Sequence, residues 1–305
     1  MSKLYNNYSD FLRQKFGQRV QKISVNGGFT CPNRDGSKGS GGCTYCNNQS
    51  FLPEYCNSEL SVLEQIGKGV EFFKKYEAQI YIAYFQSYTN TYGTLQELQT
   101  KYEQALSHPK VVGLSIATRP DCVDEQILDY LSFLAKKYYI LIEYGVESTD
   151  NETLKQINRG HTFDTSVWAI NETAKRKIAV GAHLILGLPY QDRRKMLSSA
   201  VTISKLPINV LKLHQLQIVK NTLMAKEFEK EPEKFQLFDL EEYINLLIEF
   251  IERLDPNITL ERFVSQSPYE WLIAPNWGLK NFEFVHKLEK KMRENGSFQG
   301  KKFDI

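Results

Sequence analysis

Three of the five cysteines lie close together in one glycine-rich stretch, at Cys31, Cys43 and Cys46. Residues 26–51 contain six glycines and few apolar side chains, so we expect a loop without a hydrophobic core of its own. Thiolates are good ligands for zinc and for iron–sulfur clusters. Three thiols in one such loop therefore predict a site for an inorganic group.

Two kinds of site fit the spacing C-x11-C-x2-C. The first is a zinc ion bound by four thiolates, with Cys56 as the fourth ligand. The second is a [4Fe–4S] cluster held by the three loop cysteines, which leaves one iron open. Structural zinc sites usually present two CxxC pairs, whereas this chain has one, and Cys56 lies outside the glycine-rich stretch. The spacing favours the cluster and leaves zinc as the alternative.

The composition is that of an ordinary globular protein. The chain has 305 residues, with 38 basic and 36 acidic side chains and a formal net charge of +2. This balance gives no global attraction of the kind expected for tight duplex binding. We find no long uncharged apolar run and no apolar leader, so we expect no membrane span and no secretory signal. An odd cysteine count with a CxxC pair fits a reducing cytosol, and we expect a cytoplasmic protein.

Strands and helices alternate along most of the chain. Short apolar runs predict strands at 20–25, 79–85, 111–116, 139–146, 180–186 and 209–214. Helical patterns separate them at 59–76, 94–107, 123–137, 164–177 and 192–205. Such alternation predicts a parallel sheet covered by helices, and a strand roughly every 30 residues is typical of a (β/α) barrel. We therefore predict an α/β fold, a partial (β/α)6 TIM-like barrel, with a doubly wound open sheet as the alternative.

The two ends of the chain depart from this alternation. We expect a helix at 8–16 that covers one end of the fold. An amphipathic helix at 239–254, a short edge strand at 258–260 and a helix at 280–294 predict an α-rich C-terminal extension. The expected divisions are an N-terminal segment 1–18, a barrel core 19–215 and an extension 216–305 packed on the barrel.

In both architectures the carboxyl ends of the strands form the functional face. The stretches that follow the predicted strands, such as TRPDC at 118–122 and GLPYQ at 187–191, carry more functional groups than plain turns require. We expect Cys122, at the end of the first stretch, to be a packing residue.

Four further motifs accompany the cysteine loop: TRPD at 118–121, EYGVES at 143–148, NRGHT at 158–162 and HLILGLP at 183–189. With them, residues 18–268 resemble the radical S-adenosylmethionine (SAM) superfamily. In particular they resemble its YhcC/YtqA-like (MnmL-like) subgroup, which is related to the radical SAM domain of the Elongator catalytic subunit. The cysteine spacing is longer than the C-x3-C-x2-C of most members. The resemblance implies a radical SAM barrel with a [4Fe–4S] cluster on the three loop cysteines.

The resemblance also implies the cofactor chemistry. The amino and carboxylate groups of SAM bind the open iron. One electron, from a donor such as flavodoxin or ferredoxin, then cleaves SAM into methionine and a 5′-deoxyadenosyl radical. The radical abstracts a hydrogen atom from the substrate, while the protein supplies positioning and excludes water.

Several residues at the strand ends match positions that surround SAM in similar proteins. Tyr45 is expected against the adenine, and Glu147 and His183 on the ribose hydroxyls. Arg159 is expected to bind the SAM carboxylate, because a guanidinium can form two parallel hydrogen bonds. The other expected contacts are Gln86, Ser87 and Tyr88 near the methionine ammonium, Thr118 and Arg119 at the pocket floor, and the backbone from Ile185 to Gly187 at the adenine edge.

Basic residues on the same face are candidates for substrate binding. The candidates are Arg193, Arg194, Lys195, His214, Lys220 and Arg262. The first three begin a predicted helix, where each positive charge opposes the helix dipole by about 0.3–1 kcal/mol. An anionic partner would offset this cost, which makes a phosphate-bearing substrate plausible; a solvated charge run is the alternative.

The resemblance favours an enzyme that modifies RNA, and specifically the side chain of a tRNA wobble uridine. Radical SAM chemistry on a small anionic metabolite is the second hypothesis. The third is a zinc-containing module that binds nucleic acid without catalysis. The third hypothesis requires zinc on the cysteines, whereas the first two require an iron–sulfur cluster. The first two differ only in the substrate.

Overall fold

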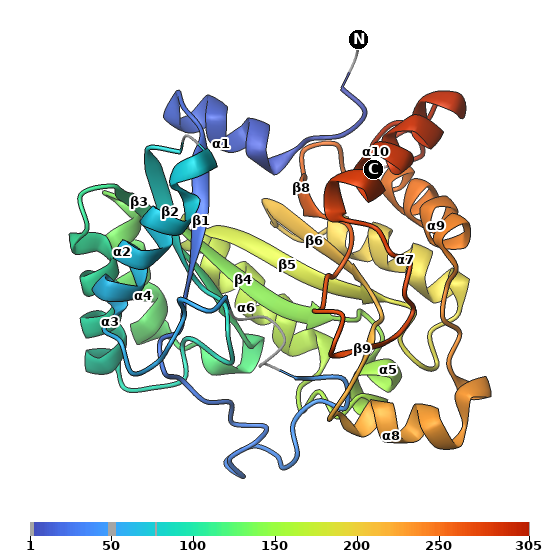
Figure 1. Cartoon of the computed structure of the whole chain (residues 1–305), viewed down its shortest axis with the longest axis horizontal. Coiled ribbons are helices and arrows are strands. Elements are labelled where there is room, and N and C mark those ends of the chain that lie inside the picture. Colours follow the sequence, from blue (N-terminus) through green and yellow to red (C-terminus); the bar gives the residue numbers. More distant parts are fainter. Residues whose placement is uncertain (1–2, 48–52, 77, 305) are drawn as a thin grey trace.

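The computed structural model describes residues 3–47, 53–76 and 78–304, so residues 48–51 at the end of the cysteine stretch lie outside it. Seven parallel strands form one sheet, in the order β1-β2-β3-β4-β5-β6-β8 (Figure 1). Their bounds are β1 (Val20–Val25), β2 (Ile80–Phe85), β3 (Val111–Thr118), β4 (Tyr139–Glu147), β5 (Ala179–Leu186), β6 (Val210–Gln215) and β8 (Thr259–Arg262).

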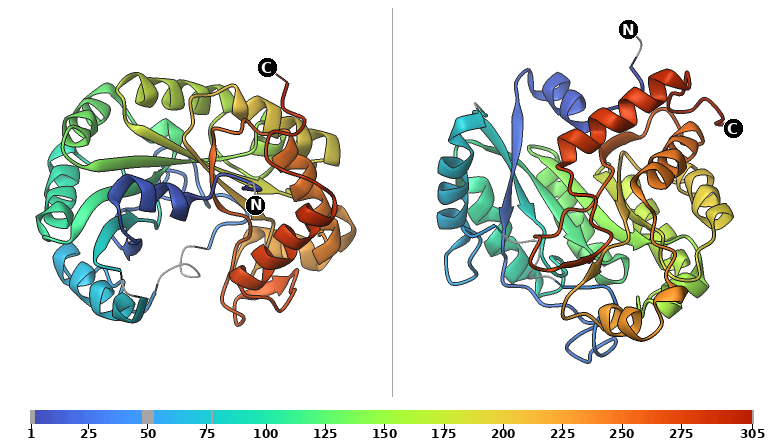
Figure 2. Two further views of the ribbon diagram at one scale, coloured as in Figure 1. Left: turned by 90° about the horizontal axis from the view of Figure 1, so that it is seen from above. Right: turned by 45° about the vertical axis from the view of Figure 1, so that its right-hand side comes forward.

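The order of the strands distinguishes the two predicted architectures. Each strand of the sheet lies beside its predecessor and the order never reverses, which excludes a doubly wound sheet. The sheet curls into an open partial barrel with helices on its outer side (Figure 2). The six predicted strands and the barrel are confirmed, and the predicted edge strand is the seventh strand, β8.

Helices connect the strands and cover the outside of the sheet. They are α2 (Val62–Phe73), α3 (Leu95–Ser107), α4 (Glu125–Ala135), α5 (Asn151–Gln156), α6 (Phe163–Lys175) and α7 (Arg193–Ser204), with short 3-10 turns η2 (Lys74–Tyr76) and η3 (Pro120–Cys122). Side chains fix where they begin. Ser61 forms a capping box with Glu64 at the start of α2, and Asp192 accepts from the backbone N–H of Lys195 at the start of α7.

The first helix, α1 (Tyr8–Phe16), lies across the amino ends of the strands (Figure 1). The hydroxyl groups of Tyr8 and Tyr139, the first residue of β4, share a hydrogen bond of 3.3 Å. Just before the helix, Asn6 accepts from the backbone N–H of Leu260 in β8 at 2.7 Å. The chain therefore covers the end of the barrel opposite the cysteine loop.

The C-terminal part packs against the last strands of the barrel. It contains β7 (Ile218–Val219), α8 (Leu223–Lys230), η4 (Pro232–Lys234), α9 (Leu240–Glu252), β9 (Leu272–Ala274) and α10 (Asn281–Glu294). The helices predicted at 239–254 and 280–294 are present as α9 and α10. The antiparallel pair β7–β9 was not predicted. Within the described residues, no helix combines the length and apolar character needed to span a bilayer.

Charged side chains interrupt the apolar interior of the barrel. Glu143 of β4 is 1% exposed and accepts from Lys22 of β1 and His183 of β5, at 2.7 and 2.8 Å, and also from Lys212 of β6. Glu261 of β8 lies 2.8 Å from Lys22. Thus an ion pair inside the barrel joins β1 and β8, the two edge strands that have no backbone pairing to each other.

Burial and charge act in opposite directions on this group. Burial alone would raise the pKa of Glu143, but the ammonium groups of Lys212 and Lys22 outweigh it and hold that pKa well below its usual range. Burial lowers the pKa of Lys212, although Glu143 and Glu261 oppose the shift. With two carboxylates facing two ammonium groups, the network is close to electrically neutral.

We expect Glu143→Leu to lower the free energy of unfolding by about 3–5 kcal/mol, because it removes one partner of a buried ion pair. Since the folded-state pKa of Glu143 is depressed, its contribution is present above the unfolded pKa and is lost as the pH falls through the folded pKa. Urea unfolding over an acidic pH series should therefore show a shallower decline for the variant.

The exposed pair of Lys74 and Glu71, 3.5 Å apart, supplies the control. Glu71→Leu should change the free energy of unfolding by less than about 0.5 kcal/mol. Equal losses from both substitutions would contradict a special role for the buried network.

Candidate active site

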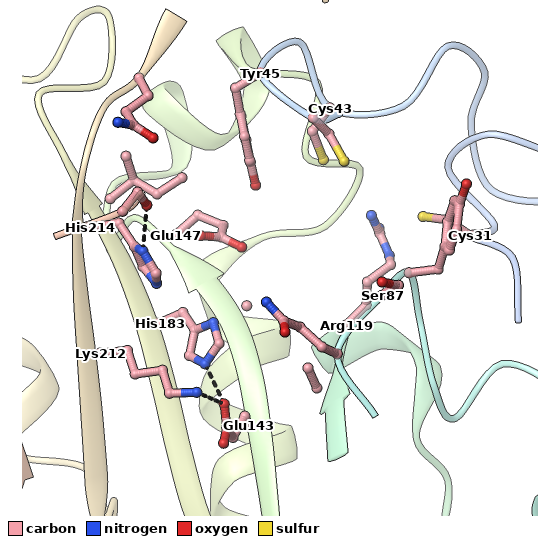
Figure 3. Close-up of a pocket in the computed structure, with 18 of the residues that line it drawn as sticks. Cys31, Cys43, Tyr45, Ser87, Arg119, Glu143, Glu147, His183, Lys212 and His214 are labelled. Atoms are coloured by element: carbon pink, nitrogen blue, oxygen red, sulfur yellow. Dashed lines mark hydrogen bonds and ion pairs between the residues drawn. The ribbon is translucent and has the colours of Figure 1, made fainter. Parts of the chain in front are cut away.

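A cavity of about 240 Å³ opens at the carboxyl ends of the strands (Figure 3). The predicted site residues that line it are Cys31, Cys43, Tyr45, Cys46, Gln86, Ser87, Tyr88, Thr118, Arg119, Glu147, Arg159, His183, Ile185, His214 and Arg262. The predicted site residues that do not line it are Gly187, Arg193, Arg194, Lys195 and Lys220. One cavity thus collects side chains from β2 to β6, from β8 and from the cysteine loop.

The cysteine loop has little regular structure and is fixed by hydrogen bonds from other segments. Asn158, in the segment after α5, donates through Nδ2 to the carbonyl groups of Ser40 and Gly42, at 3.1 and 2.8 Å. Asn158 has a φ of 51°, a left-handed conformation that asparagine adopts more readily than most residues. On the other side, the backbone N–H of Met224 in α8 donates to the carbonyl of Thr44 at 2.9 Å.

The positions of the cysteines separate the two inorganic groups that the spacing allowed. Cys31, Cys43 and Cys46 line the cavity, whereas Cys56 is buried elsewhere and donates its thiol to the carbonyl of Ser24 at 2.9 Å. In residues 3–47, 53–76 and 78–304, no three His, Cys, Asp or Glu side chains converge on a point suited to one metal ion. Thiols that bind different irons of one cluster need no such convergence. The arrangement disfavours a four-thiolate zinc site.

Hydrogen-bond donors surround the loop thiols. Arg159 Nη1 and Asn33 Nδ2 lie 3.5 and 3.7 Å from Cys43 Sγ. Arg34 donates to the carbonyl of Cys46 at 2.7 Å. Burial and the neighbouring Cys43 raise the pKa of the Cys46 thiol to about 11, and Arg34 opposes the shift. Asn33 and Arg34 were not among the residues predicted from the sequence, although both lie between the first two loop cysteines.

The part of the cavity expected to hold SAM contains polar atoms without partners. Among the described residues, Ser87 Oγ, Arg119 Nη1 and Arg159 Nε are buried and make no hydrogen bond. Thr118 shares a hydrogen bond with Thr91 through their hydroxyl groups. Buried polar atoms are usually satisfied, so the unpaired ones indicate where a polar ligand belongs.

Glu147 takes an unusual backbone conformation at the end of β4. Its φ is 67°, and the pairing of β4 with β5 shifts register between Gly145 and Glu147. A positive φ is uncommon outside glycine, and such irregularities often re-aim a side chain beside an active site. Here the carboxylate lies 3.8 Å from Arg159 at the cavity wall. Tyr45 lies on the loop side of Glu147 (Figure 3).

Two neighbouring histidines, His183 of β5 and His214 of β6, line the cavity (Figure 3). His183 Nε2 bonds to Glu143, and the rings of His183 and His214 have centroids 5.6 Å apart. His214 Nδ1 lies 2.6 Å from Ser265 Oγ. Burial lowers the pKa of His214 well below its usual value, and the neighbouring His183 and Arg262 lower it further. This imidazole is therefore neutral at pH 7.

The run at the start of α7 does not reach the cavity. Arg193 pairs with Glu249 of α9 at 2.7 Å, and Lys195 pairs with Asp150 at 3.0 Å. These carboxylates, with the capping Asp192, already supply the negative charge that the run was expected to take from a substrate. Lys220 also lies outside the cavity, and its backbone bonds to Trp271.

The cavity also contains residues that the sequence did not single out as site residues. Lys212 of β6 and Glu143 of β4 lie at its floor (Figure 3), and Gln217, Gln266 and Ser267 line it together with Arg262. A charged residue inside an otherwise apolar strand was the available signal for Lys212 and Glu143.

The predicted site residue Gly187 packs its backbone against Phe238 outside the cavity, where an added Cβ would lie 3.0 Å from the ring.

Comparison with known proteins identifies the class. A model of the radical SAM superfamily matches residues 30–200, and a model of the radical SAM C-terminal domain matches residues 208–294. The chain belongs to the radical SAM superfamily. Within it, YtqA of Bacillus subtilis is 34% identical over 304 residues, which cover 99% of this chain and 93% of that protein. The resemblance noted in the sequence is confirmed.

Two more distant matches extend this comparison. The tRNA uridine(34) acetyltransferase of Methanocaldococcus infernus is 27% identical over 158 residues, or 50% of this chain and 28% of that protein. The solved structure of Elp3 from M. infernus matches with a TM-score of 0.72 at 16% identity. The match covers 92% of this chain and 64% of that one, and it establishes the shared fold.

The protein is thus a radical SAM enzyme, and enzymes of this class use a [4Fe–4S] cluster and SAM. The residues present fit these groups. Three thiols share one cavity with the unpaired Ser87, Arg119 and Arg159 atoms. SAM carries a carboxylate, an ammonium and ribose hydroxyl groups, which are suitable partners for such atoms.

We expect Asn158→Ala to loosen the cysteine loop without unfolding the barrel. Two loop carbonyl groups lose their donor, which costs about 1–3 kcal/mol where they stay buried. Hydrogen exchange should then be faster in residues 31–46, and unchanged in β4. Asn171→Ala, which removes a bond within α6 to Val167 of 2.8 Å, is the control and should leave the loop's exchange unaltered. Unchanged exchange of residues 31–46 in the Asn158 variant would contradict the role of Asn158 in holding the cysteine loop.

Proposed function

We propose that this radical SAM enzyme modifies the side chain of a tRNA wobble uridine. The observation that carries the proposal is that Arg262, Gln217 and Gln266 line the same cavity as the three loop cysteines. Arg262 is exposed and, within the described ranges, makes no ion pair. A cation and amide groups that share one cavity suit a nucleobase edge with a nearby phosphate.

One of the comparisons supports an RNA substrate, and another adds the shared fold. One partial match, which covers 50% of this chain, is named a tRNA uridine(34) acetyltransferase. The Elp3 structure has the same fold. Neither match specifies the reaction, and the proposal therefore concerns the substrate class and the position of the modified nucleoside.

In this proposal Cys31, Cys43 and Cys46 hold the cluster, one iron each. When bound, the cluster and SAM supply a 5′-deoxyadenosyl radical that takes a hydrogen atom from the substrate. The residues of the chain bind and orient both molecules, and the walls of the cavity exclude water. A reductant is required, and a flavodoxin or ferredoxin in the cytoplasm is the donor that we propose.

The proposed SAM contacts follow from the chemistry of the cavity wall. The ring of Tyr45 packs against the adenine, and the Glu147 carboxylate accepts from ribose hydroxyl groups. The ionised Glu143 can only accept from His183 Nε2, so in the neutral form of this ring the other nitrogen would be free to accept from a ribose hydroxyl. The remaining proposed contacts are Gln86, Ser87, Tyr88, Thr118, Arg119 and Ile185.

We expect Cys31→Ser, Cys43→Ser and Cys46→Ser each to abolish the brown colour and the bound iron after anaerobic reconstitution. Cys56→Ser is the matched control, because a serine hydroxyl can take over the bond to the Ser24 carbonyl. It should retain full iron and sulfide content. A colourless zinc protein, or loss of iron in the Cys56 variant alone, would contradict the proposed ligand set.

We expect the reconstituted enzyme, given SAM, a reductant and tRNA from a deletion strain, to form 5′-deoxyadenosine and a nucleoside of altered mass. Arg262→Gln should lower the tRNA-dependent kcat/KM at least about tenfold, equivalent to about 1.4 kcal/mol, while SAM cleavage without tRNA stays the same. Mass spectrometry of digested tRNA measures the product.

An identical nucleoside profile in wild-type and deletion strains would refute the tRNA proposal. Faster SAM cleavage with a small anionic metabolite than with tRNA would instead support the alternative substrate class, for which Arg262 is also suited. Both outcomes leave the radical SAM class unaffected.

A further inference from the structure

Two buried side chains converge on the sulfur of one cysteine. Asn33 and Arg159 are 1% and 6% exposed, and their nitrogen atoms lie 3.7 and 3.5 Å from Cys43 Sγ. One donor comes from the cysteine loop itself and the other from the segment after α5. Both therefore point N–H groups at a thiol that water scarcely reaches.

The geometry of both donors is fixed by further contacts. Arg159 also donates through Nη2 to the carbonyl of Gly145 and lies 3.8 Å from Glu147. Asn33 Nδ2 bonds to the carbonyl of Asn158 at 2.6 Å.

The glycine next to Arg159 permits this close packing. Gly160 has a φ of +77°, and a Cβ there would lie 3.0 Å from Asn33 Oδ1 and 3.2 Å from Arg119 Nη2. Any larger residue at this position would displace the side chains of Asn33 and Arg119. The contact with Cys43 Sγ therefore belongs to a tightly built site rather than to a mobile surface chain.

This arrangement changes the role expected for Arg159. The sequence suggested a bidentate bond to the carboxylate of SAM. In the structure both terminal nitrogens are engaged, Nη1 with Cys43 Sγ and Nη2 with the Gly145 carbonyl. The guanidinium is oriented toward a sulfur, so its positive charge and one N–H act first on the group that Cys43 binds.

We propose that Arg159 and Asn33 raise the reduction potential of the iron–sulfur cluster through hydrogen bonds to Cys43 Sγ. This inference rests on the proposed function, in which Cys43 is a cluster ligand. The step concerned is transfer of one electron from the reductant, with no bond made or broken. The added electron increases the negative charge on the thiolate sulfur, and N–H donors and a fixed cation stabilise that charge.

The experiment compares four reconstituted proteins in the absence of SAM. They are the wild type, Asn33→Leu, Arg159→Lys and a control, Arg119→Lys. Arg119 is a second buried arginine of the cavity, but its bonds go to Asp121, at 2.8 and 3.0 Å. Both lysine variants keep the positive charge, so the comparison isolates the N–H···S contact. Iron and sulfide analysis first establishes equal loading.

The readout is the midpoint potential, measured by electron paramagnetic resonance during a redox titration. In Asn33→Leu and Arg159→Lys, we expect the ratio of reduced to oxidised cluster at a given poise to fall about tenfold. For a one-electron couple this is a shift of about 59 mV to more negative potential. Arg119→Lys should shift the ratio by less than about threefold, since it removes no donor from a sulfur.

A second readout does not depend on the reduced state. Resonance Raman bands of the iron–thiolate bonds should move to higher frequency in Asn33→Leu and Arg159→Lys, because a sulfur without its N–H donor binds iron more strongly. If a variant cannot be titrated, this shift decides the matter.

Three results would overturn the inference: unchanged potentials with unchanged Raman bands in both donor variants, a shift in the opposite direction, or an equal shift in Arg119→Lys. Failure of the proposed ligand set is distinguishable from these, since wild-type protein would then show no four-iron signal at all. Failure of the tRNA proposal appears only in the nucleoside profile and leaves the cluster signal in place.

Discussion

The open barrel depends on a set of opposite charges buried inside it. Glu143 lies between Lys22 and Lys212, and Glu261 completes the set from the last strand. In a closed barrel a hydrogen-bond ladder joins the first strand to the last. Here β1 and β8 are not paired through their backbones, so the interior ion pair connects these two strands instead. Removal of a single member leaves a charge without compensation in a medium that solvates charge poorly. The same carboxylate bonds to His183, so the element that braces the sheet also orients a side chain of the cavity.

Above this floor, the cysteine loop takes its shape from its neighbours rather than from its own residues. Its glycines allow the sharp course of the chain, and its carbonyl groups bond to Asn158 on one side and to Met224 on the other. These partners come from the barrel and from the C-terminal part. A loop of this kind could not hold three thiols in place in an isolated peptide, because ordering it without such partners costs too much conformational entropy. The site is therefore a property of the whole fold.

The sequence predicted those features that local pattern determines. The strand predicted at 139–146 is β4 (Tyr139–Glu147), because a buried parallel strand is apolar on both faces. Polar residues after such strands could be assigned to one face for the same reason. The charge network was out of reach, since Glu143 and its partner Lys22 are 121 positions apart. The partner of Arg193 was out of reach for the same reason, because its counter-charge, Glu249, lies on α9. The pair β7–β9 is too short for any periodicity to appear.

The two ends of the described chain are tied to one another at the amino end of the barrel. The backbone N–H of Asn6 donates to Gln299 Oε1 at 2.9 Å, and the N–H of Gln299 donates to the carbonyl of Leu4 at 2.8 Å. The cysteine loop lies at the opposite end of the sheet (Figure 1). A fusion partner, affinity tag or surface tether joined beyond either described end therefore starts from the end of the barrel opposite the cavity mouth.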